Sequence, residues 1–379
     1  MVLALNEEQL MLKDAAASFL LEKAPVAALR KLRDERSKKG YSEILWKEMV
    51  EMGWAGIAIA EEFDGLGYGY VGLGIVLQEL GRHLSASPIF STVLLSASAI
   101  EFAGSNEQKS TLLPAIAAGE LLLSFALQEG KHHAPNNVAT SAEKTVTGYR
   151  LNGNKVFVLD AHIAEKFIVA ARTSGEIGDA DGISLFLVDS GQVGVSVERV
   201  FMLDSRNAGT VSLSDVKVNN DALLGREGCG AAVIERVMDI ANAGLSAELL
   251  GLSLQAFEQT MEYLKQRVQF GQHIGAFQGL QHRAADMFSE LELCKSLVMS
   301  SLMAIDNEEQ ELSILVSATK AKMAQVAKRI TNESIQMHGG IGMTDELDIG
   351  FYIKRARVAQ QTFGDYHYHL DRYALLNGY

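Results

Sequence analysis

The chain has 379 residues, more than a single hydrophobic core usually reaches, so two or three packed modules are expected. It is 48% hydrophobic with only 4 prolines, a composition that favours a folded, mostly helical protein and excludes a disordered one. The formal net charge is −13 and the basic residues look scattered, which argues against a nucleic-acid partner.

The N-terminal stretch MVLALNEEQLMLKD lacks the basic start, apolar core and small-residue cleavage site of a secretory signal. No uninterrupted apolar run reaches the roughly 18 residues of a membrane-spanning helix. We therefore expect a cytoplasmic protein with no integral membrane segment. The two cysteines, Cys229 and Cys294, share no metal-ligand spacing and are expected to be small apolar residues.

Residues 1–120 have a helical pattern and are predicted to form an N-terminal helical domain. Asn6 and Gln9 predict a capping box at the start of the first helix. Breaks are expected at 63–69, where glycines alternate with other residues, and around Pro88 and Pro114.

Residues 121–220 change period and are predicted to form a central β domain. Short β-branched or aromatic runs separated by turn residues predict an antiparallel sheet, sandwich or barrel. The runs are 149–151, 155–158, 167–170, 183–188 and 211–213. Asn152-Gly153-Asn154 predicts a hairpin turn between the first two runs, because Asn and Gly tolerate positive φ.

Residues 221–379 return to helix and are predicted to form a C-terminal helical domain. Long helices are expected at about 231–267, 277–305, 309–337 and 346–375. The predicted fold class is therefore α+β, mostly α, in the order helices, sheet, helices.

Two breaks between the C-terminal helices carry a chemical signal. The stretch RVQFG, residues 267–271, combines an arginine fork with the backbone N–H groups of a glycine turn, a combination that binds pyrophosphate. The stretch IQMHGGIGMT, residues 335–344, lets the backbone come close to an anion in the same way. By themselves, the first also fits a polar helix–helix loop, and the second fits a helix end capped by Gly339.

Seven motifs follow one another over nearly the whole chain. They are Leu5-Asn6-Glu7-Glu8-Gln9, Gly53-Trp54 followed by Glu61-Glu62-Phe63-Asp64-Gly65-Leu66-Gly67, Leu112-Leu113-Pro114, Asn152-Gly153-Asn154-Lys155, Arg267-x-Gln269-Phe270-Gly271, Phe277-Gln278-x-x-Gln281, and Gln336-x-His338-Gly339-Gly340-x-Gly342. In this order they resemble the acyl-CoA dehydrogenase family, and the chain looks like a divergent bacterial-type member. The resemblance implies an N-terminal helical domain, a central β domain and a C-terminal four-helix bundle domain. It also implies bound FAD and the removal of two hydrogens from an acyl-CoA thioester.

The resemblance further implies that cofactor contacts are shared between subunits. Gln336 and the Gly339-Gly340 turn would approach the ADP part of an FAD held mainly by a neighbouring subunit. The contacts from the other side of that interface would be Arg267, Gln269, Phe270 and Gln278. The family usually forms tetramers, so a homotetramer or a hetero-oligomer is expected.

On its flavin-facing strands the chain departs from the family pattern. A stretch that often contains Thr-Glu-Pro is replaced by residues 126–137, in which the Gln128 amide can still donate a hydrogen bond. Where the family has Trp-Ile-Thr this chain has Phe157-Val158-Leu159, which keeps a stacking ring but loses the hydroxyl near flavin N5. Gln128 and Phe157 are therefore the expected contacts in this region.

The chemistry requires a carboxylate that removes the α-proton and a flavin that accepts the β-hydride. The two positions that carry this base in the family are occupied here by Phe363 and by Ala241, which precedes Asn242. Glu248 returns to almost the same helix face as Ala241 and is the first candidate base; Asp365 is the second. The alternatives are that Glu248 pairs with an arginine and that Asp365 caps a helix.

Two functions from different classes follow. The first is FAD-dependent α,β-dehydrogenation of an acyl-CoA thioester in fatty acid or steroid side-chain β-oxidation, with an electron-transfer flavoprotein as acceptor. The alternative is a non-catalytic partner subunit of a heteromeric dehydrogenase, motivated by the loss of both usual base positions; flavoenzymes of the same fold that react with oxygen stay open. The pairs His132-His133 and His367-x-His369 lack a third ligand, so no metal is predicted.

Overall fold

The structure, a computed structural model, describes residues 4–379. The chain forms two compact units: one contains residues up to 31, 70–85 and 242–379, and the other contains 32–69 and 86–241. The first unit is helical and the second holds the large sheet, which confirms the predicted mostly helical α+β class. The three predicted domain ranges stay a prediction.

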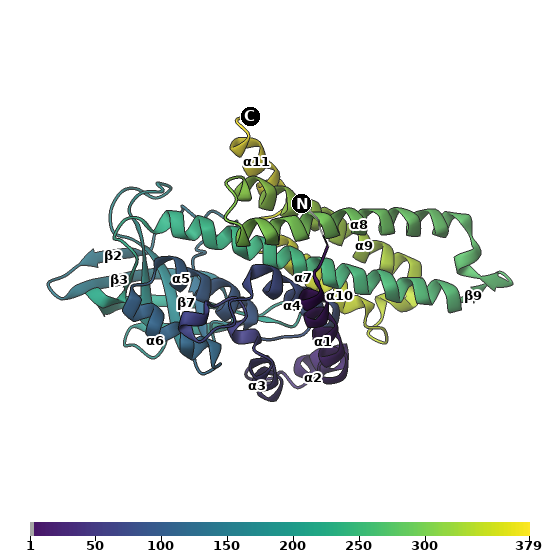
Figure 1. The fold of residues 1–379 in the computed structure, drawn as a ribbon, viewed down its shortest axis with the longest axis horizontal. Coiled ribbons are helices and arrows are strands. Elements are labelled where there is room, and N and C mark those ends of the chain that lie inside the picture. Colours follow the sequence, from purple (N-terminus) through teal and green to yellow (C-terminus); the bar gives the residue numbers. More distant parts are fainter. Residues whose placement is uncertain (1–3) are drawn as a thin grey trace. The chain divides into compact units, whose positions relative to one another are not determined.

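The first unit is a bundle of helices joined by short connections. Its helices are α1 (Glu7–Lys23), α4 (Gly69–His83), α7 (Gly230–Gln266, from residue 242 onward), α8 (Gln278–Asp306), α9 (Leu312–His338), α10 (Ile349–Gln361) and α11 (Tyr366–Leu376), while α2 (Val26–Asp34) begins here and ends in the other unit. α7, α8 and α9 lie side by side, and successive helices run in opposite directions because their connections are short (Figure 1). The predicted capping box is confirmed, since the side chains and backbone N–H groups of Asn6 and Gln9 bond reciprocally.

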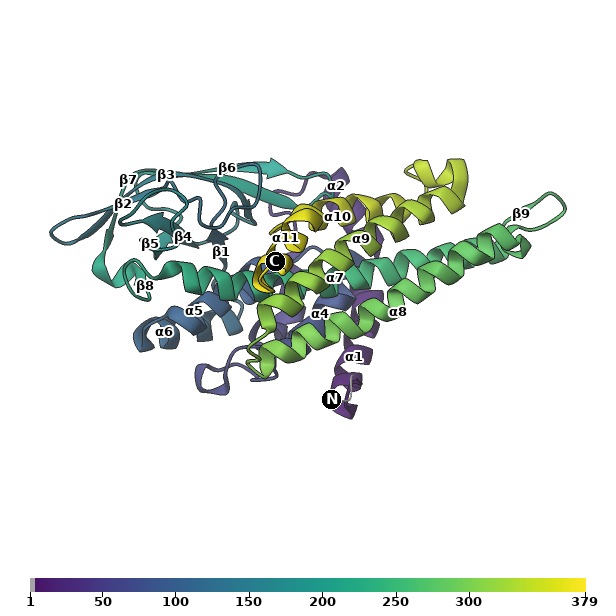
Figure 2. The ribbon, with the colours of Figure 1, turned by 90° about the horizontal axis from the view of Figure 1, so that it is seen from above.

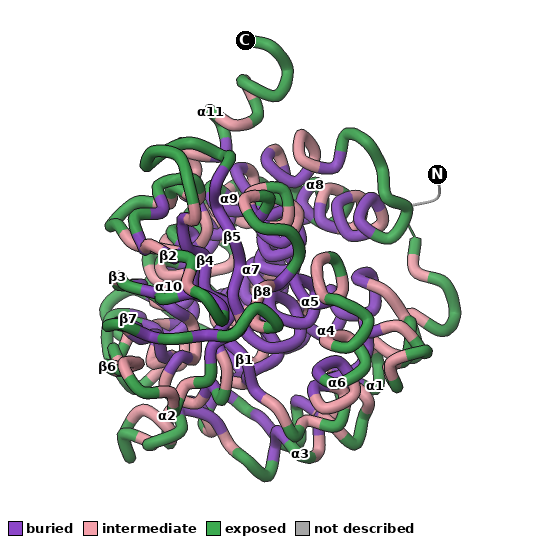
Figure 3. The backbone as a smooth tube through the Cα atoms, turned by 90° about the vertical axis from the view of Figure 1, so that its left-hand side faces the viewer, coloured by how far each residue is buried: buried purple, intermediate pink, exposed green. Residues whose placement is uncertain are grey.

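The middle of α7 forms the core of this bundle. Residues 242–253 are all buried (Figure 3). α7 has the length and apolar composition of a membrane span, yet 94% of its most apolar window is buried inside the protein. Its hydropathy is therefore that of a core helix.

α4 and α7 approach each other closely through glycines. A Cβ atom on Gly81 would lie 2.2 Å from the carbonyl oxygen of Glu248, and one on Gly251 would lie 1.8 Å from the carbonyl oxygen of Gln78. Real Cβ atoms do not come so close to backbone oxygens. Only glycine at both positions permits this helix crossing.

The predicted single helix at 346–375 is wrong, because the chain breaks between α10 and α11. Phe363 and Gly364 have φ values of 56° and 104°, which an α-helix does not contain. The carboxylate of Asp365 then caps α11 by accepting a hydrogen bond of 2.9 Å from the N–H of Tyr368. The break leaves a turn of buried and half-buried residues, 362–365, that carries one of the two family base positions.

The second unit contains shorter helices besides its sheet. They are α3 (Glu43–Glu51), the π-helix η3 (Ile89–Ala97), α5 (Ser98–Ala103), α6 (Asn106–Ala117) and the 3-10 turns η1 (Trp54–Gly56), η2 (Glu61–Phe63) and η4 (Asn220–Ala222). The break predicted at 63–69 is confirmed, because η2 ends there and α4 begins only at Gly69. The break predicted at Pro114 is wrong: this proline lies inside α6, where its missing N–H removes a single backbone bond near the helix end.

The sheet of the second unit has eight strands (Figure 2). They are β1 (Leu123–Ala126), β2 (Ser141–Lys144), β3 (Gly148–Leu159), β4 (Lys166–Arg172), β5 (Ile183–Asp189), β6 (Val195–Phe201), β7 (Asn207–Asn219) and β8 (Leu223–Leu224), in the order β6-β7-β3-β2-β4-β5-β8 with β1 paired to β4. The pairing is antiparallel as predicted, except that β1 is parallel to β4 and β2 touches β4 in parallel at one residue pair. β4 and β5 are buried over most of their length and form the core of this unit.

Residues 152–154 do not form the predicted hairpin turn. β3 runs through them without reversing, although its pairing with β7 shifts register on both sides. Gly153 has φ 154°, and a Cβ there would lie 2.4 Å from Oγ1 of Thr140, so glycine serves a close approach here. The hairpin instead joins β2 to β3, where the N–H of Thr145 donates to the carbonyl of Gly148 at 2.8 Å.

Candidate functional site

Predicted FAD contacts of the first unit lie at one end of the helical bundle. α7 ends and α8 begins there, joined by a hairpin of β9 (Val268–Gln269) and β10 (Gln272–His273) and by the 3-10 turn η5 (Ile274–Ala276). At the hairpin tip, Phe270 and Gly271 have φ values of 54° and 79°, the positive pair that a type I′ turn requires. Phe270 is 91% exposed, and a Cβ on Gly271 would meet nothing within 4 Å. The hairpin therefore projects from the end of the bundle (Figure 1), and the Phe270 ring at its tip is exposed.

The glycine turn that ends α9 and begins η6 (Gly339–Met343) lies at the same end of the bundle, because α9 runs antiparallel to α8. Gly339 has φ 66° and ψ −144°, a combination confined to glycine. A Cβ on Gly340 would meet nothing within 4 Å, and Gln336 is exposed. The ring of His338 stacks on Tyr263 of α7 at 4.4 Å, which ties the end of α9 to the last turn of α7.

These two segments fit the ADP part of FAD. Exposed side chains of Arg267, Gln269 and Gln278 supply a guanidinium and two amides beside the hairpin, and the glycine turn supplies backbone that no side chain covers. We expected these two segments on opposite sides of a subunit interface. The structure places both at one end of a single chain, so one chain can present them to the same ligand.

In the second unit the structure brings together the predicted flavin contacts Gln128 and Phe157. Gln128 follows β1, and its carbonyl accepts a hydrogen bond of 2.7 Å from the N–H of Val156, the residue before Phe157. Phe157 has φ 54° and is 38% exposed, because β3 shifts register between residues 155 and 158. The irregularity leaves a ring partly open to solvent, beside the Gln128 amide. The Nε2 of Gln128 donates to the carbonyl of Gly130 at 3.0 Å and has a second hydrogen for a ligand. The ring and the amide together are a suitable wall for a flat ligand.

Behind these contacts lies a buried ion pair that sequence reasoning missed. The Nζ of Lys155 is fully buried and donates to Glu129 Oε1 at 2.5 Å and to the carbonyl of Leu127 at 3.2 Å. Burial lowers the pKa of Lys155 to about 8, although Glu129 opposes this shift. Glu129 also accepts hydrogen bonds from the backbone N–H groups of Ala139 and Thr140. The pair therefore anchors both ends of the loop, residues 126–137, that replaces the family motif. A lysine alternating with apolar residues in a strand was the available sequence signal.

The turn at 362–365 is held rigidly by polar groups. The Nζ of Lys320 donates to the carbonyls of Thr362 and Gly364 at 2.8 and 2.9 Å, and complete burial lowers the pKa of Lys320 to about 7. The Asn242 amide donates to the carbonyl of Phe363 at 3.3 Å. Asn242, the residue after one family base position, thus contacts Phe363, which occupies the other. Neither Ala241 nor Phe363 has a side chain that can accept a proton.

Asp365 lies on this turn, but its carboxylate is already engaged. One oxygen caps α11, as described above, and the side chain is half-buried. Its position matches the alternative that the sequence left open, a helix cap.

Glu248 is buried with 1% of its surface exposed, and it forms a two-pronged ion pair with Arg355 of α10. Its Oε1 accepts from Nε at 2.9 Å and its Oε2 accepts from Nη2 at 2.8 Å. A general base needs a free oxygen that faces the substrate proton. In this structure both oxygens bind the guanidinium, which is the arginine pairing weighed against the role of base.

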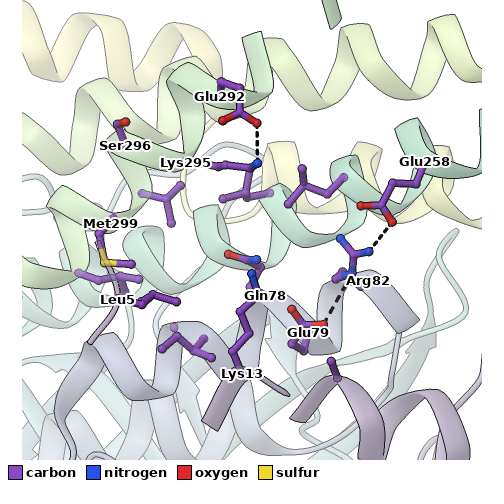
Figure 4. Close-up of a pocket in the computed structure, with 17 residues that line it drawn as sticks. Leu5, Lys13, Gln78, Glu79, Arg82, Glu258, Glu292, Lys295, Ser296 and Met299 are labelled. Atoms are coloured by element: carbon purple, nitrogen blue, oxygen red, sulfur yellow. Dashed lines mark hydrogen bonds and ion pairs between the residues drawn. The ribbon is translucent and has the colours of Figure 1, made fainter. Parts of the chain in front are cut away.

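A cavity of about 580 Å³ lies between α1, α4, α7 and α8 (Figure 4). Arg82 lies between Glu79 and Glu258 and forms ion pairs with both. Burial raises the pKa of Glu79, against the opposing charge of Arg82. Three cationic and three acidic side chains line the cavity, so its lining carries no net formal charge. None of the predicted cofactor or catalytic residues lines it.

Comparison with known proteins covers almost the whole chain. The N-terminal, middle and C-terminal domain models of acyl-CoA dehydrogenase match residues 6–120, 126–216 and 228–374. The isovaleryl-CoA dehydrogenase of Arabidopsis thaliana is 30% identical over 365 residues, which cover 94% of this chain and 88% of that protein. The CarC subunit of a caffeyl-CoA reductase–Etf complex from Acetobacterium woodii is 28% identical over 359 residues, 93% of each chain.

A solved structure shows the same fold. The butyryl-CoA dehydrogenase of Megasphaera elsdenii matches with a TM-score of 0.90 and 27% identity, over 99% of this chain and 100% of that one. The family, its helical and sheet domains and its cofactor, FAD, agree with the expectations drawn from the seven motifs. The chain belongs to the acyl-CoA dehydrogenase family.

Proposed function

We propose that the chain takes part in FAD-dependent α,β-dehydrogenation of an acyl-CoA thioester. In this reaction a carboxylate takes a proton from the α carbon, and FAD supplies the acceptor for a hydride from the β carbon, leaving an enoyl thioester. The residues of this chain would hold FAD at the exposed bundle end and at the Gln128–Phe157 wall. FAD and substrate of this class are the ones that the family uses.

One observation carries the proposal: the hairpin tip and the glycine turn are uncovered at the same end of the bundle. Phe270 is 91% exposed, and glycines 271, 339 and 340 face open space. An aromatic ring so exposed on a projecting tip is typical of a surface that another molecule covers. We therefore propose that a second subunit and its FAD cover this end, in a homotetramer or a hetero-oligomer.

The base has two candidate sources. In the first version Glu248 is the base, which requires Arg355 to release at least one carboxylate oxygen when substrate binds. In the second version this chain is the partner subunit that lends cofactor contacts, and another polypeptide supplies the carboxylate. The ion pair of Glu248 and the phenylalanine at position 363 motivate the second version. The first version stays the main one, because the relatives of this chain are named as dehydrogenases.

The first experiment is a visible absorption spectrum of the purified protein, followed anaerobically while acyl-CoA thioesters of different chain length and a steroid side-chain thioester are added. A flavin spectrum that bleaches with one thioester supports the dehydrogenase and names its substrate class. A protein that binds no flavin alone and also binds none after co-expression with its genomic neighbours overturns the proposal. Oxygen uptake during turnover would reassign the chain to the oxygen-reacting enzymes of this fold.

A second experiment separates the two sources of the base. Glu248→Gln is compared with Glu262→Gln, which removes an exposed carboxylate near the end of the same helix. If Glu248 is the base, flavin content is kept and thioester-dependent bleaching is lost only in the first variant. If both variants bleach normally in a co-purified hetero-oligomer, the base lies on the other chain. A flavin-loaded homotetramer that is active alone excludes the partner-subunit version.

The electron acceptor and cellular setting are also proposals. The A. woodii relative is named as a subunit of a complex with Etf, which supports an electron-transfer flavoprotein as acceptor. Reoxidation of the thioester-reduced protein by such a flavoprotein, followed by stopped-flow absorbance, tests this. We propose a cytoplasmic location and a role in β-oxidation of a fatty acid or steroid side chain.

A further inference from the structure

A second pocket, of about 330 Å³, lies in the other compact unit, and none of the predicted FAD or catalytic residues lines it. It is formed by the end of α2 and the loop that follows, and by the end of β6 and the turn to β7. Its walls include Leu32, Arg33, Arg36, Arg199, Phe201 and Ser205, and none of its lining residues is acidic. Three arginines therefore give the pocket a basic wall in a chain of net charge −13, and one of them, Arg33, is paired through its Nε with the Asp34 carboxylate at 2.7 Å.

The sequence around this pocket corrects the view that basic residues are scattered. Residues 30–39 hold six lysines and arginines against two acidic residues. Two of the three pocket arginines, Arg33 and Arg36, belong to this run. Arg199 comes from β6, more than 160 residues later, so the complete cluster exists only in the folded chain.

Hydrogen bonds and close packing hold the walls of this pocket in place. The guanidinium of Arg199 donates to the carbonyls of Ser37 and Lys38 at 2.8 and 2.6 Å, and its Nε donates to Asn207 at 2.8 Å. A Cβ on Gly40 would lie 1.8 Å from Asn207, so the loop packs directly on β7. Arg199 has five N–H donors, and with a second bond to Asn207 four are in use, leaving one for a ligand.

Arg36 occupies a backbone position that normally suits glycine. Its φ is 48°, and its N–H bonds the carbonyl of Arg33 while the N–H of Ser37 bonds that of Leu32. These are the two bonds of a Schellman helix end, whose left-handed residue is usually glycine. A charged side chain kept at a strained position beside a pocket is a reason to look for a ligand.

We propose that this pocket binds the phosphate groups of a nucleotide-sized organic anion. Guanidinium groups donate charged hydrogen bonds to phosphate oxygens, and Arg33, Arg36 and Arg199 line one small cavity, Arg199 with a single N–H left. Phe201 is 61% exposed, with Arg199 over its ring at 4.3 Å, and together with Leu32 it offers an apolar wall for a base or another flat group. The volume is near the lower end of small-molecule pockets, which suits a nucleotide. Free nucleotides and the nucleotide end of CoA share this chemistry.

The test uses the FAD-loaded protein, so that ADP cannot report on an empty FAD site. Calorimetric titrations with ADP, with CoA and with inorganic pyrophosphate are carried out on the wild type, Arg36→Gln, Arg36→Gly and the control Lys47→Gln. Lys47 is an exposed lysine on α3 of the same unit, with 80% of its side chain accessible. ADP or CoA should bind the wild type and Lys47→Gln alike, and about 10-fold or more weakly to both Arg36 variants.

If Arg36 binds the ligand, Arg36→Gly should weaken binding and at the same time raise the melting temperature, because glycine relieves the left-handed backbone. A purely structural role for Arg36 would not produce this combination. Binding of ADP alone or of CoA alone supports the pocket and identifies the source of the nucleotide. Equal binding by all four proteins, a loss shared with Lys47→Gln, or a response to pyrophosphate only would overturn the proposal. A change of native mass in Arg36→Gln with no ligand effect would also overturn it, in favour of a protein interface. Flavin content is measured in parallel and should not change, so this result is independent of the proposed dehydrogenase function.

Discussion

At the scale of single residues, breaking the ion pair of Glu248 and Arg355 should lower the free energy of unfolding most. Both side chains are almost fully buried, and each is the other's counter-charge. Replacing Arg355 with Met leaves a buried carboxylate without its partner. The free energy of unfolding should fall by about 3–5 kcal/mol, measured by urea denaturation.

The matched control is Glu262→Gln, which breaks an ion pair whose side chains are 69% and 61% exposed. That variant should lose less than about 1 kcal/mol. The double variant Glu248→Leu/Arg355→Met should lose less free energy of unfolding than the single variants Glu248→Leu and Arg355→Met together, because neither buried charge is left alone. Equal losses in Arg355→Met and in the control would show that the pair is not the buried unit described above.

Lys320 gives a prediction about pH. Its pKa is about 7 in the folded chain and 10.5 in the reference state, so between these values the unfolded chain holds more protons at this site. Stability then rises with pH across that window, by up to about 1.4 kcal/mol for each unit of pKa difference. In Lys320→Met the rise in urea midpoint between pH 7 and 9 should be smaller than in the wild type. Lys155 still contributes from about pH 8 upward.

Lys320→Met should also lower stability at pH 7, because the carbonyls of Thr362 and Gly364 lose their donor. Lys328→Met, an exposed lysine on the same helix, is the control and should keep the pH profile of the wild type. If the two variants have the same profile, the depressed pKa of Lys320 is refuted.

At the scale of helices and strands, the crossing of α4 and α7 depends on glycine. Gly251→Ala places a methyl group against the carbonyl of Gln78, which belongs to a packed helix and cannot turn aside. We expect a loss of about 3 kcal/mol or more in the free energy of unfolding. Gly350→Ala, in α10 with nothing within 4 Å, should instead be neutral or gain up to about 1 kcal/mol. A small loss for Gly251→Ala would mean that the two helices separate easily.

Periodic elements could be predicted from the sequence, and long-range contacts could not. α7, α8 and α9 were expected to within a few residues, because an apolar face repeats along each of them. The hairpin turn predicted at 152–154 is wrong because Gly153 is required by its close contact with Thr140, and only the folded sheet brings these two residues together. The break between α10 and α11 depends on the left-handed backbone at Phe363, a residue type that gives no local turn signal.

The candidate site divides in the same way. The RVQFG and HGG stretches were recognisable because several of their residues are adjacent in sequence. Arg355 was not, since it lies 107 residues from Glu248, and a sequence alone does not say which arginine a buried glutamate will meet. Lys155 and Glu129, 26 residues apart, were missed for the same reason.

At the scale of the whole molecule, the exposed cofactor end predicts that FAD binding and subunit association are coupled. If FAD is held by two subunits, dilution should release FAD as the oligomer dissociates, and added FAD should shift the association to lower protein concentration by the same factor. Arg267→Met should weaken both by about 10- to 100-fold, because it removes a charged hydrogen-bond donor. The control, Lys265→Met, removes an exposed cation one residue before the end of α7 and should change neither. Analytical ultracentrifugation with detection at the flavin absorbance measures mass and cofactor together over a dilution series. Monomers that keep their FAD would refute a shared site, and an oligomer that survives in Arg267→Met without FAD would show that assembly does not need the cofactor.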